Sequence, residues 1–287
     1  MQTQEMTVTS QQRALHQVTN GIPATDGDGV KMTRIIGSPE LNMLDPFLLL
    51  DVFESDDAQD YIGGFPPHPH RGFETVTYLL AGRLRHKDNA GHEGVIEAGG
   101  VQWMTAARGI VHSEMPEQEN GLLKGFQLWV NLPADKKMNE PAYQEFPADR
   151  IAIEKRDDGT TIRVIAGVTN NGTHGPVENQ DVNPTYMDVV LSKGHTFEQI
   201  INVNDNAFIF VINGELIIGT DGRKLSAQQL GILRDGNTVS VNANEDSRFL
   251  LLAAKPLNEP VARGGPFVMN TKAEVLQAFE DFQHNRF

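Results

Sequence analysis

Short apolar or alternating runs, many of them rich in β-branched residues, recur along the chain from about Met32 onward and are separated by Gly, Pro, Asn and Asp. Each run has the length of a strand, and the separating residues favour turns. The runs are Phe73–Leu80, Gly94–Met104, Gly125–Leu132, Thr161–Gly167, Ala207–Ile212, Glu215–Gly219 and Arg248–Ala254. Many short strands with turns between them are typical of an all-β sandwich or barrel.

Two halves of the chain repeat one layout. In each half an apolar run leads into a glycine, and a second apolar segment follows after a turn. The stretch Pro133–Arg150 between the halves is polar and contains three prolines, so we expect it to be the connector. We therefore predict a flexible N-terminus, residues 1–20, followed by two β-barrels in tandem, over residues 21–140 and 141–287.

One segment near the C-terminus departs from the strand pattern. In Thr271–Gln283 the apolar residues recur at helical spacing. Thr271 is suited to be the N-cap, and Glu274 three residues later completes a capping box. A short C-terminal α-helix is therefore expected after the second barrel.

The chain contains no cysteine, which excludes disulfide frameworks, iron–sulfur clusters and thiolate metal sites. A metal would have to be held by nitrogen and oxygen. The formal net charge of −14 at pH 7 argues against direct nucleic-acid binding, which needs clustered Lys and Arg. No apolar run approaches the ~20 residues that span a bilayer, and the N-terminal sequence does not resemble a secretory signal. We expect a cytoplasmic protein, with access to the nucleus if the source is a eukaryote.

Two short motifs contain candidate metal ligands. In GFPPHPHRGFETVTYLL, His68 and His70 are one residue apart, and Glu74 has the same parity. Because alternate side chains of a strand point to the same side, the two imidazoles are expected to share a face. A lone H-x-H is more often part of an ordinary strand or turn than a metal site.

The second motif makes a metal site the better interpretation. In MTAARGIVHSEMPE, His112 and Glu114 are again two residues apart and again close to a proline. Two strands that each present a pair of nitrogen or oxygen donors can converge inside a barrel on one cation. Three imidazoles and one carboxylate suit a first-row divalent metal and leave open positions for substrate or O₂.

These motifs, together with GHEG, GFQLWVNL and GPFVMNT, resemble those of the pirin family of the cupin superfamily. The resemblance runs from about Val30 to the C-terminal helix. It implies a bicupin of two jelly-roll barrels, of which the N-terminal barrel binds one Fe(II) and the C-terminal barrel binds none. Mn, Co, Ni, Cu or Zn could substitute for iron at such donors. The ligands that the resemblance implies are His68, His70, His112 and Glu114.

Glu74 is the alternative to Glu114 as the fourth ligand. The general cupin motif has a glutamate shortly after H-x-H, which Glu74 satisfies, whereas the resemblance to pirins favours Glu114. Pro116 also matches pirins, since other cupins carry asparagine at that position. Glu74 is then expected to be an outer or structural carboxylate. The other residues expected at the pocket, or in the hairpin and core beside it, are His92, Phe65, Phe73 and Met104.

The second half of the chain lacks the donor pattern of the first. Its corresponding segment holds one histidine, His195, with Phe197 in the place of a partner, and SVNANEDSRFLLL contains no histidine. A lone histidine is more often a surface or packing residue than a ligand, so no metal site is expected in the second barrel.

The resemblance implies two classes of function. The first is a quercetin 2,3-dioxygenase-like enzyme, in which O₂ opens the ring of a flavonol or similar small aromatic substrate, and Glu114 accepts the proton of the substrate hydroxyl. The second is a regulator that binds a protein partner according to the oxidation state of its iron. A cupin that keeps its metal for stability alone is the third interpretation that the residues leave open.

Overall fold

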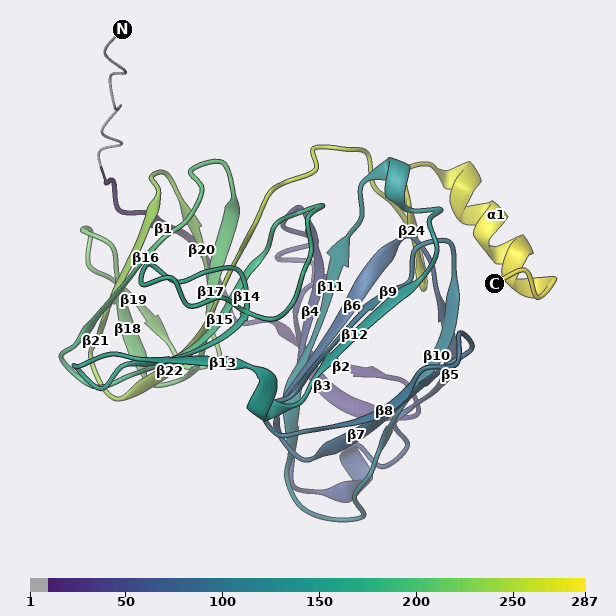
Figure 1. Ribbon diagram of the computed structural model, residues 1–287, viewed down its shortest axis with the longest axis horizontal. Helices are drawn as coiled ribbons and strands as arrows, with labels where there is room; N and C mark the ends of the chain where they lie inside the picture. Colours follow the sequence, from purple (N-terminus) through teal and green to yellow (C-terminus); the bar gives the residue numbers. More distant parts are fainter. Residues whose placement is uncertain (1–9) are drawn as a thin grey trace, which may run out of the picture.

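The computed structural model describes residues 10–287. In this part of the chain the fold is all-β, except for short 3₁₀ turns and one C-terminal α-helix, and the strands form two barrels that lie side by side (Figure 1). The predicted fold class is confirmed. The 3₁₀ turns are η1 (Ala58–Asp60), η2 (Ala134–Lys136) and η3 (Ala148–Arg150).

The N-terminal barrel consists of a seven-stranded and a four-stranded antiparallel sheet. In spatial order, the larger sheet contains β12 (Ala142–Phe146), β9 (Val101–Thr105), β6 (Phe73–Ala81), β11 (Leu123–Asn131), β4 (Phe47–Ser55), β3 (Val30–Ile36) and β2 (Ile22–Asp26). The smaller sheet contains β5 (Phe65–His70), β10 (Ile110–Pro116), β7 (Arg83–Asp88) and β8 (Glu93–Glu97).

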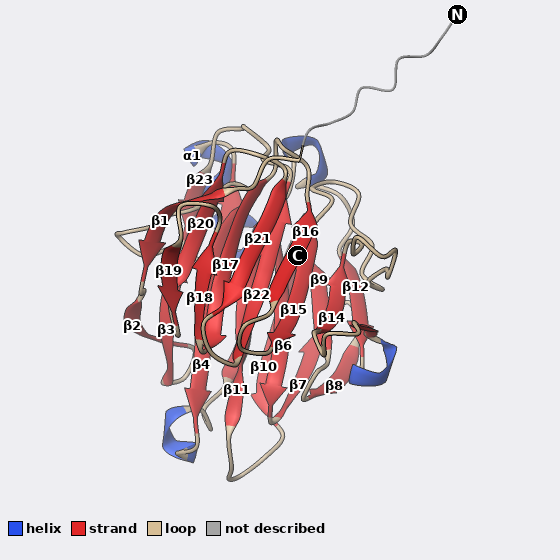
Figure 2. Cartoon of the chain, turned by 90° about the vertical axis from the view of Figure 1, so that its left-hand side faces the viewer, coloured by secondary structure: helices blue, strands red, loops and turns tan. Residues whose placement is uncertain are grey.

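The C-terminal barrel repeats this arrangement, and in Figure 2 this barrel faces the viewer. Its seven-stranded sheet contains β1 (Ala14–Thr19), β20 (Leu230–Arg234), β17 (Asn206–Asn213), β22 (Ser247–Ala254), β15 (Thr185–Leu191), β14 (Thr161–Ala166) and β13 (Ala152–Lys155). Its four-stranded sheet contains β16 (Thr196–Ile200), β21 (Thr238–Ala243), β18 (Glu215–Ile218) and β19 (Arg223–Ser226).

The two seven-stranded sheets pack against each other through an apolar core that draws on both barrels. The Phe47 and Phe208 rings meet edge to face with centroids 5.1 Å apart. The Tyr78 hydroxyl donates to Asp188 at 2.5 Å, so polar groups also join the barrels. Central strands of the larger sheets, such as β4 and β22, are therefore buried on both faces, which explains their near-continuous apolar runs.

The interiors of the two barrels differ. A second apolar cluster fills the C-terminal barrel, where Phe197 packs against Phe249 with ring centroids 5.5 Å apart. In the N-terminal barrel a smaller apolar cluster, which includes Leu79 and Tyr61, fills one end. The rest of that interior contains the cavity described below, which is lined by both polar and apolar side chains.

The chain ends cross between the barrels, which changes the predicted domain limits. Residues 14–19 were expected to belong to a flexible N-terminus, but they form β1, which pairs with β20 of the C-terminal barrel. Residues 1–9 of that predicted segment lie outside the described residues. β12 pairs with β9, so the N-terminal barrel extends beyond the expected limit at residue 140. Strand pairing satisfies backbone groups wherever an edge is available, and sequence proximity does not select that edge.

The C-terminal end of the chain lies on the N-terminal barrel (Figure 1). We refer to residues 261–287 as the C-terminal strap. It comprises the β23 (Ala262–Gly264) and β24 (Phe267–Met269) hairpin and helix α1 (Lys272–Gln283). The predicted capping box is confirmed, because Thr271 and Glu274 exchange both hydrogen bonds. The Val268 N–H donates to the Arg71 carbonyl at 3.0 Å, and Arg71 pairs with Asp281 at 2.7 Å.

Within residues 10–287, no helix is both long and apolar enough to cross a membrane. The cytoplasmic location stays a prediction from the sequence.

Candidate metal centre

The candidate ligands lie on two neighbouring strands, β5 and β10. β5 is an edge strand, and three of its six residues are prolines, Pro66, Pro67 and Pro69. An edge position tolerates proline because the missing N–H is not needed by a further strand. In the β5–β10 register His112 lies directly opposite His68. The strand pairing therefore brings together two motifs that are some forty residues apart in sequence.

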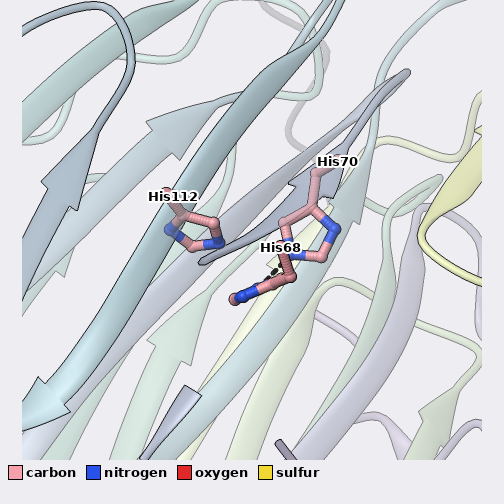
Figure 3. A group of neighbouring side chains, drawn as sticks. All are labelled: His68, His70 and His112. Carbon is pink, nitrogen blue, oxygen red and sulfur yellow. Dashed lines mark hydrogen bonds between the residues drawn. The ribbon is translucent and has the colours of Figure 1, made fainter. Parts of the chain in front are cut away.

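The three histidines form a compact group (Figure 3). One ring nitrogen from each of His68, His70 and His112 lies within 4.8 Å of the other two. The Nε2 atoms of His68 and His70 are 3.0 Å apart. His70 and His112 are almost completely buried, with 4% and 2% of their surface exposed. The predicted convergence of the three imidazoles is therefore present in the structure.

Hydrogen bonds determine which nitrogen of His68 and His70 faces the group. The His68 Nδ1 lies 2.8 Å from the Pro66 carbonyl oxygen, and the His70 Nδ1 lies 3.4 Å from the Pro266 carbonyl oxygen. A carbonyl oxygen only accepts, so each Nδ1 carries the proton and each Nε2 presents a lone pair. Two lone pairs that face each other at this distance repel unless a cation lies between them. This arrangement fits a metal ion.

His112 supplies the third free nitrogen. Its Nε2 is buried and has no hydrogen-bond partner among the described residues, which is unusual for a buried polar atom. Burial and the neighbouring histidines lower the pKa of both His70 and His112 well below the ordinary value, so both imidazoles are neutral at neutral pH. Neutral imidazoles with free lone pairs are the ligands that first-row divalent metals take.

Glu114 lies on the same face of β10 as His112 and is 5% exposed. Its Oε1 accepts a hydrogen bond from the Thr77 hydroxyl at 2.8 Å, and the Gln127 amide nitrogen lies 3.5 Å away. Its carboxylate borders the same cavity as His68 and His70. Glu114 does not, however, belong to the described group of donors that lie within 4.8 Å of one another. The structure thus brings three of the four predicted ligands into direct proximity and the fourth to the cavity wall.

Glu74 faces away from the imidazoles. β5 ends at His70 and β6 begins at Phe73 in the other sheet, so the parity that Glu74 shares with His70 in sequence does not continue across the break. Its carboxylate accepts hydrogen bonds from Thr105 at 2.7 Å and from Asn179 of the C-terminal barrel at 2.5 Å. Burial raises the pKa of Glu74 to about 7, against the opposing effect of these hydrogen bonds. Glu74 is a structural carboxylate between the barrels, one of the two roles expected for it, and it does not line the cavity.

A cavity of about 600 Å³ opens beside the imidazoles. One part of its wall is apolar and aromatic, and another is polar. The lining residues are Asp26, Gly27, Asp28, Met32, Asp51, Phe53, Phe65, Pro66, His68, Pro69, His70, Glu114, Gln127, Trp129, Gly265 and Pro266. Of the two phenylalanines predicted at the pocket, Phe65 therefore lines it.

The other predicted pocket residues do not line the cavity. Phe73 is buried and packs against His70 and Trp129, with ring centroids 5.0 Å and 4.3 Å away. Met104 belongs to a small apolar cluster beside β10. His92 lies in the β7–β8 hairpin, where its N–H donates to Asp88 at 2.9 Å. Phe73 therefore packs against two residues of the cavity wall, and neither Met104 nor His92 is among the lining residues.

The C-terminal strap completes one side of the site. The Pro266 carbonyl orients His70, and Gly265 and Pro266 line the cavity. Lys137, which is 1% exposed, holds the strap in place by donating to the carbonyls of Gly72 at 2.6 Å and Val268 at 2.9 Å. Burial lowers the pKa of Lys137 to about 8. The N-terminal metal centre thus depends on a segment about 200 residues away in sequence.

Sequence reasoning missed several residues around the site. Gln127 and Trp129 line the cavity, and the alternation in GFQLWVNL places both on one face. His86 is buried next to His112, with the two Nδ1 atoms 3.5 Å apart, and its Nε2 lies 3.1 Å from Asp88. His86 and Asp88 have the same two-residue spacing as the two recognised motifs, and that signal could have identified them.

Comparison with known proteins gives the same family for both halves of the chain. The pirin family model matches residues 29–130, and the model of the pirin C-terminal cupin domain matches residues 186–287. A pirin-like protein of Caulobacter vibrioides is 53% identical over 275 residues, which cover 96% of this chain and 99% of the relative.

Solved structures share the fold. The crystal structure of quercetin 2,3-dioxygenase from Acinetobacter baumannii matches with a TM-score of 0.87 and 35% identity, over 96% of this chain and 98% of that one. A bacterial pirin from Escherichia coli, solved in complex with nickel(II), matches with a TM-score of 0.65 and 22% identity, over 84% of this chain and 99% of that one. With both family models matched and a relative of this similarity along nearly its whole length, the chain belongs to the pirin family.

Proposed function

We propose that the protein is a metal-dependent dioxygenase that uses O₂ to open the ring of a flavonol or a similar enolizable aromatic compound. The proposed metal is Fe(II), with one ion in the N-terminal barrel. The observation that carries this proposal is the group of three imidazole nitrogens, each with its lone pair free, beside a cavity large enough for a small aromatic molecule.

His68, His70 and His112 would hold the ion through Nε2, and Glu114 would be the fourth ligand. Iron, when bound, supplies Lewis acidity and one-electron chemistry that allow an organic substrate to react with O₂. The chain contributes neutral donors in a buried group, and the Nδ1 hydrogen bonds of His68 and His70 hold their rings in position.

Glu114 is also proposed as the base that accepts the proton of the substrate hydroxyl. Its Oε1 is held by Thr77, while Oε2 accepts no hydrogen bond from the described residues. A carboxylate that is fixed at one oxygen and free at the other can take a proton without leaving its place. Removal of this proton makes the substrate electron-rich, which favours its reaction with O₂.

The cavity wall supports an aromatic substrate. Trp129, Phe65 and Phe53 offer ring surfaces, and Met32 adds a flexible apolar side chain. Such a wall favours a flat apolar molecule, and the histidines and Glu114 at one side give it a direction. The likeness to quercetin 2,3-dioxygenase from Acinetobacter baumannii supports a flavonol as the first substrate to test.

The test is anaerobic loading with Fe(II), followed by addition of quercetin and O₂. We expect uptake of one O₂ and release of one carbon monoxide for each flavonol opened. His112→Ala should lose both metal and turnover, whereas Glu114→Gln should lower turnover more than metal content. Full turnover by iron-loaded Glu114→Gln would contradict the role of Glu114 as base.

The same experiment separates the dioxygenase from the regulatory alternative. Iron-loaded protein that takes up no O₂ with quercetin or with related enolizable aromatics would overturn the proposal. A protein partner that binds only one oxidation state of the iron form would then favour a regulator. The metal content of the protein as purified tests the assignment of iron.

A further inference from the structure

Behind His112 lies a row of buried polar side chains that the proposed reaction does not use. His86 and Asp88 lie on β7, which pairs with β10 so that Asp88 is opposite His112 and His86 is opposite Glu114. Their exposed fractions are 2% and 7%. Burying an imidazole and a carboxylate is costly unless both are hydrogen-bonded. Their contacts with each other and with His112 indicate what they do.

Hydrogen bonds join His112 to His86 and His86 to Asp88, and in each of them the donor is the residue nearer to the candidate metal centre. The Asp88 Oδ2 lies 3.1 Å from the His86 Nε2, and the His86 Nδ1 lies 3.5 Å from the His112 Nδ1. An ionised carboxylate only accepts, so the His86 Nε2 carries a proton and the His86 Nδ1 has a lone pair. That lone pair can accept from the His112 Nδ1. This series of hydrogen bonds therefore selects the His112 tautomer that carries its proton on Nδ1 and leaves Nε2 free. The Nε2 is the buried atom without a partner among the described residues.

Other groups keep Asp88 and His86 in place. The Asp88 Oδ1 accepts from the backbone N–H groups of Ala90 at 3.0 Å and His92 at 2.9 Å. The Tyr143 ring stacks on His86, with centroids 4.7 Å apart and planes 24° apart, and also on His92 at 5.1 Å and 19°. The Asp88 Oδ2 also lies 3.0 Å from the His92 Nδ1. Asp88 thus has one oxygen engaged by the backbone of the hairpin turn and the other placed between the His86 and His92 rings.

We propose that Asp88 and His86 are positioning residues that hold His112 in the metal-binding tautomer. This inference rests on the proposed metal site. It assigns a role to two residues that would not touch the metal or the substrate. Partners of this kind typically change metal affinity by 10–100-fold when they are altered.

Asp88→Asn is the decisive variant because it should reverse the donor and acceptor roles in this series of hydrogen bonds. Its amide oxygen can still accept from Ala90 and His92, so the hairpin is kept. Its amide N–H₂ would then face the His86 Nε2 and donate to it. His86 would carry its proton on Nδ1 and donate to His112, whose own proton would move to Nε2. A protonated Nε2 has no lone pair for a metal.

The first measurement uses Co(II) alone as the probe and follows its absorption spectrum during titration. We expect Asp88→Asn to bind Co(II) 10–100-fold more weakly than the wild type. His86→Phe removes the acceptor without forcing the wrong tautomer of His112. Its loss of Co(II) affinity should therefore be smaller than that of Asp88→Asn. His92→Gln removes another contact of Asp88 and is the matched control, with affinity expected within about twofold of the wild type.

The second measurement is the nitrogen NMR spectrum of the histidine rings in metal-free protein. The proton of His112 should be on Nδ1 in the wild type and on Nε2 in Asp88→Asn, with similar unfolding temperatures for both. Unchanged Co(II) affinity and an unchanged His112 tautomer in Asp88→Asn would overturn the inference. Should that variant fail to fold, the same result for His86→Phe would overturn it.

These outcomes are distinct from failure of the proposed function. If the wild type binds no Co(II), the metal site itself is wrong, yet the NMR measurement still tests whether Asp88 controls His112. If the wild type binds Co(II) but catalyses no ring opening, only the proposed reaction fails.

Discussion

Replacement of Glu74 by Gln should stabilise the protein at neutral and alkaline pH. Glu74 lies between the two barrels, 4% exposed, and its carboxylate accepts from Thr105 and Asn179. No cation pairs with it among the described residues. Burial raises its pKa from the ordinary 4.5 to about 7, so the folded protein favours the protonated form.

The sign and size of the effect follow from this difference. Between pH 4.5 and 7 the folded state binds a proton at Glu74 that the unfolded state has lost, so stability falls as pH rises through this window. At about 1.4 kcal/mol for each pH unit, the rise from 4.5 to about 7 corresponds to a loss of about 3 kcal/mol above pH 7. Gln has nearly the size of protonated Glu, accepts through its amide oxygen, and can donate its N–H₂ to the Thr105 hydroxyl. It does not ionise, so it has no such loss.

Urea unfolding between pH 4.5 and 8.5 tests this reasoning. The stability of Glu74→Gln relative to the wild type should increase across the range, from about 1 kcal/mol at pH 5 to about 3 kcal/mol at pH 8. Glu178→Gln is the matched control, because Glu178 is exposed on the segment that carries Asn179, and it should leave the wild-type pH profile unchanged. A difference between Glu74→Gln and the wild type that is the same at pH 5 and pH 8 would refute the assignment of a buried, protonated carboxylate.

Three further changes probe the surroundings of the metal centre. Lys137→Met removes an ammonium group whose pKa burial lowers to about 8. Between pH 8 and 10.5 the free energy of unfolding of the wild type should rise by about 3 kcal/mol relative to that of this variant. A difference in urea unfolding that does not change with pH would contradict this expectation. Gly109→Ala places a methyl group 2.7 Å from the Phe287 ring at a φ of +145°; a loss of about 1–3 kcal/mol is expected, part of which Phe287→Ala in the same chain should restore. Thr77→Val keeps the shape but removes the hydroxyl that donates to Glu114; about tenfold weaker Co(II) binding with little change in unfolding temperature is expected, and unchanged affinity would mean that Glu114 needs no such support.

The spacing of residues along the strands explains why the three histidines of the candidate metal centre could be predicted from the sequence. His68 and His70 share a face because alternate residues of a strand do, and His112 repeats the pattern at a second strand. Each motif needed only to be a strand, and the antiparallel pairing of β5 with β10 then placed His112 opposite His68. The prediction of three converging imidazoles depended on short-range geometry and proved correct.

The same parity rule was misleading for Glu74. It holds only while a strand continues, and the chain changes sheets between His70 and Phe73. Glu74 therefore faces the second barrel. For Glu114 the rule placed the side chain on the correct face, but the Thr77 hydroxyl, from another strand, determines where its carboxylate points.

The sequence by itself determined the all-β class, the capped C-terminal helix and the two histidine motifs, since these follow from residue spacing within a dozen positions. Only the tertiary structure decided which partners complete the site: the Pro266 carbonyl on His70, the buried Lys137 that holds the C-terminal strap, and the His86–Asp88 pair behind His112. Hydrogen bonds form between whichever buried donors and acceptors the packing brings together. That packing joins segments up to about 200 residues apart, a distance over which periodicity carries no information.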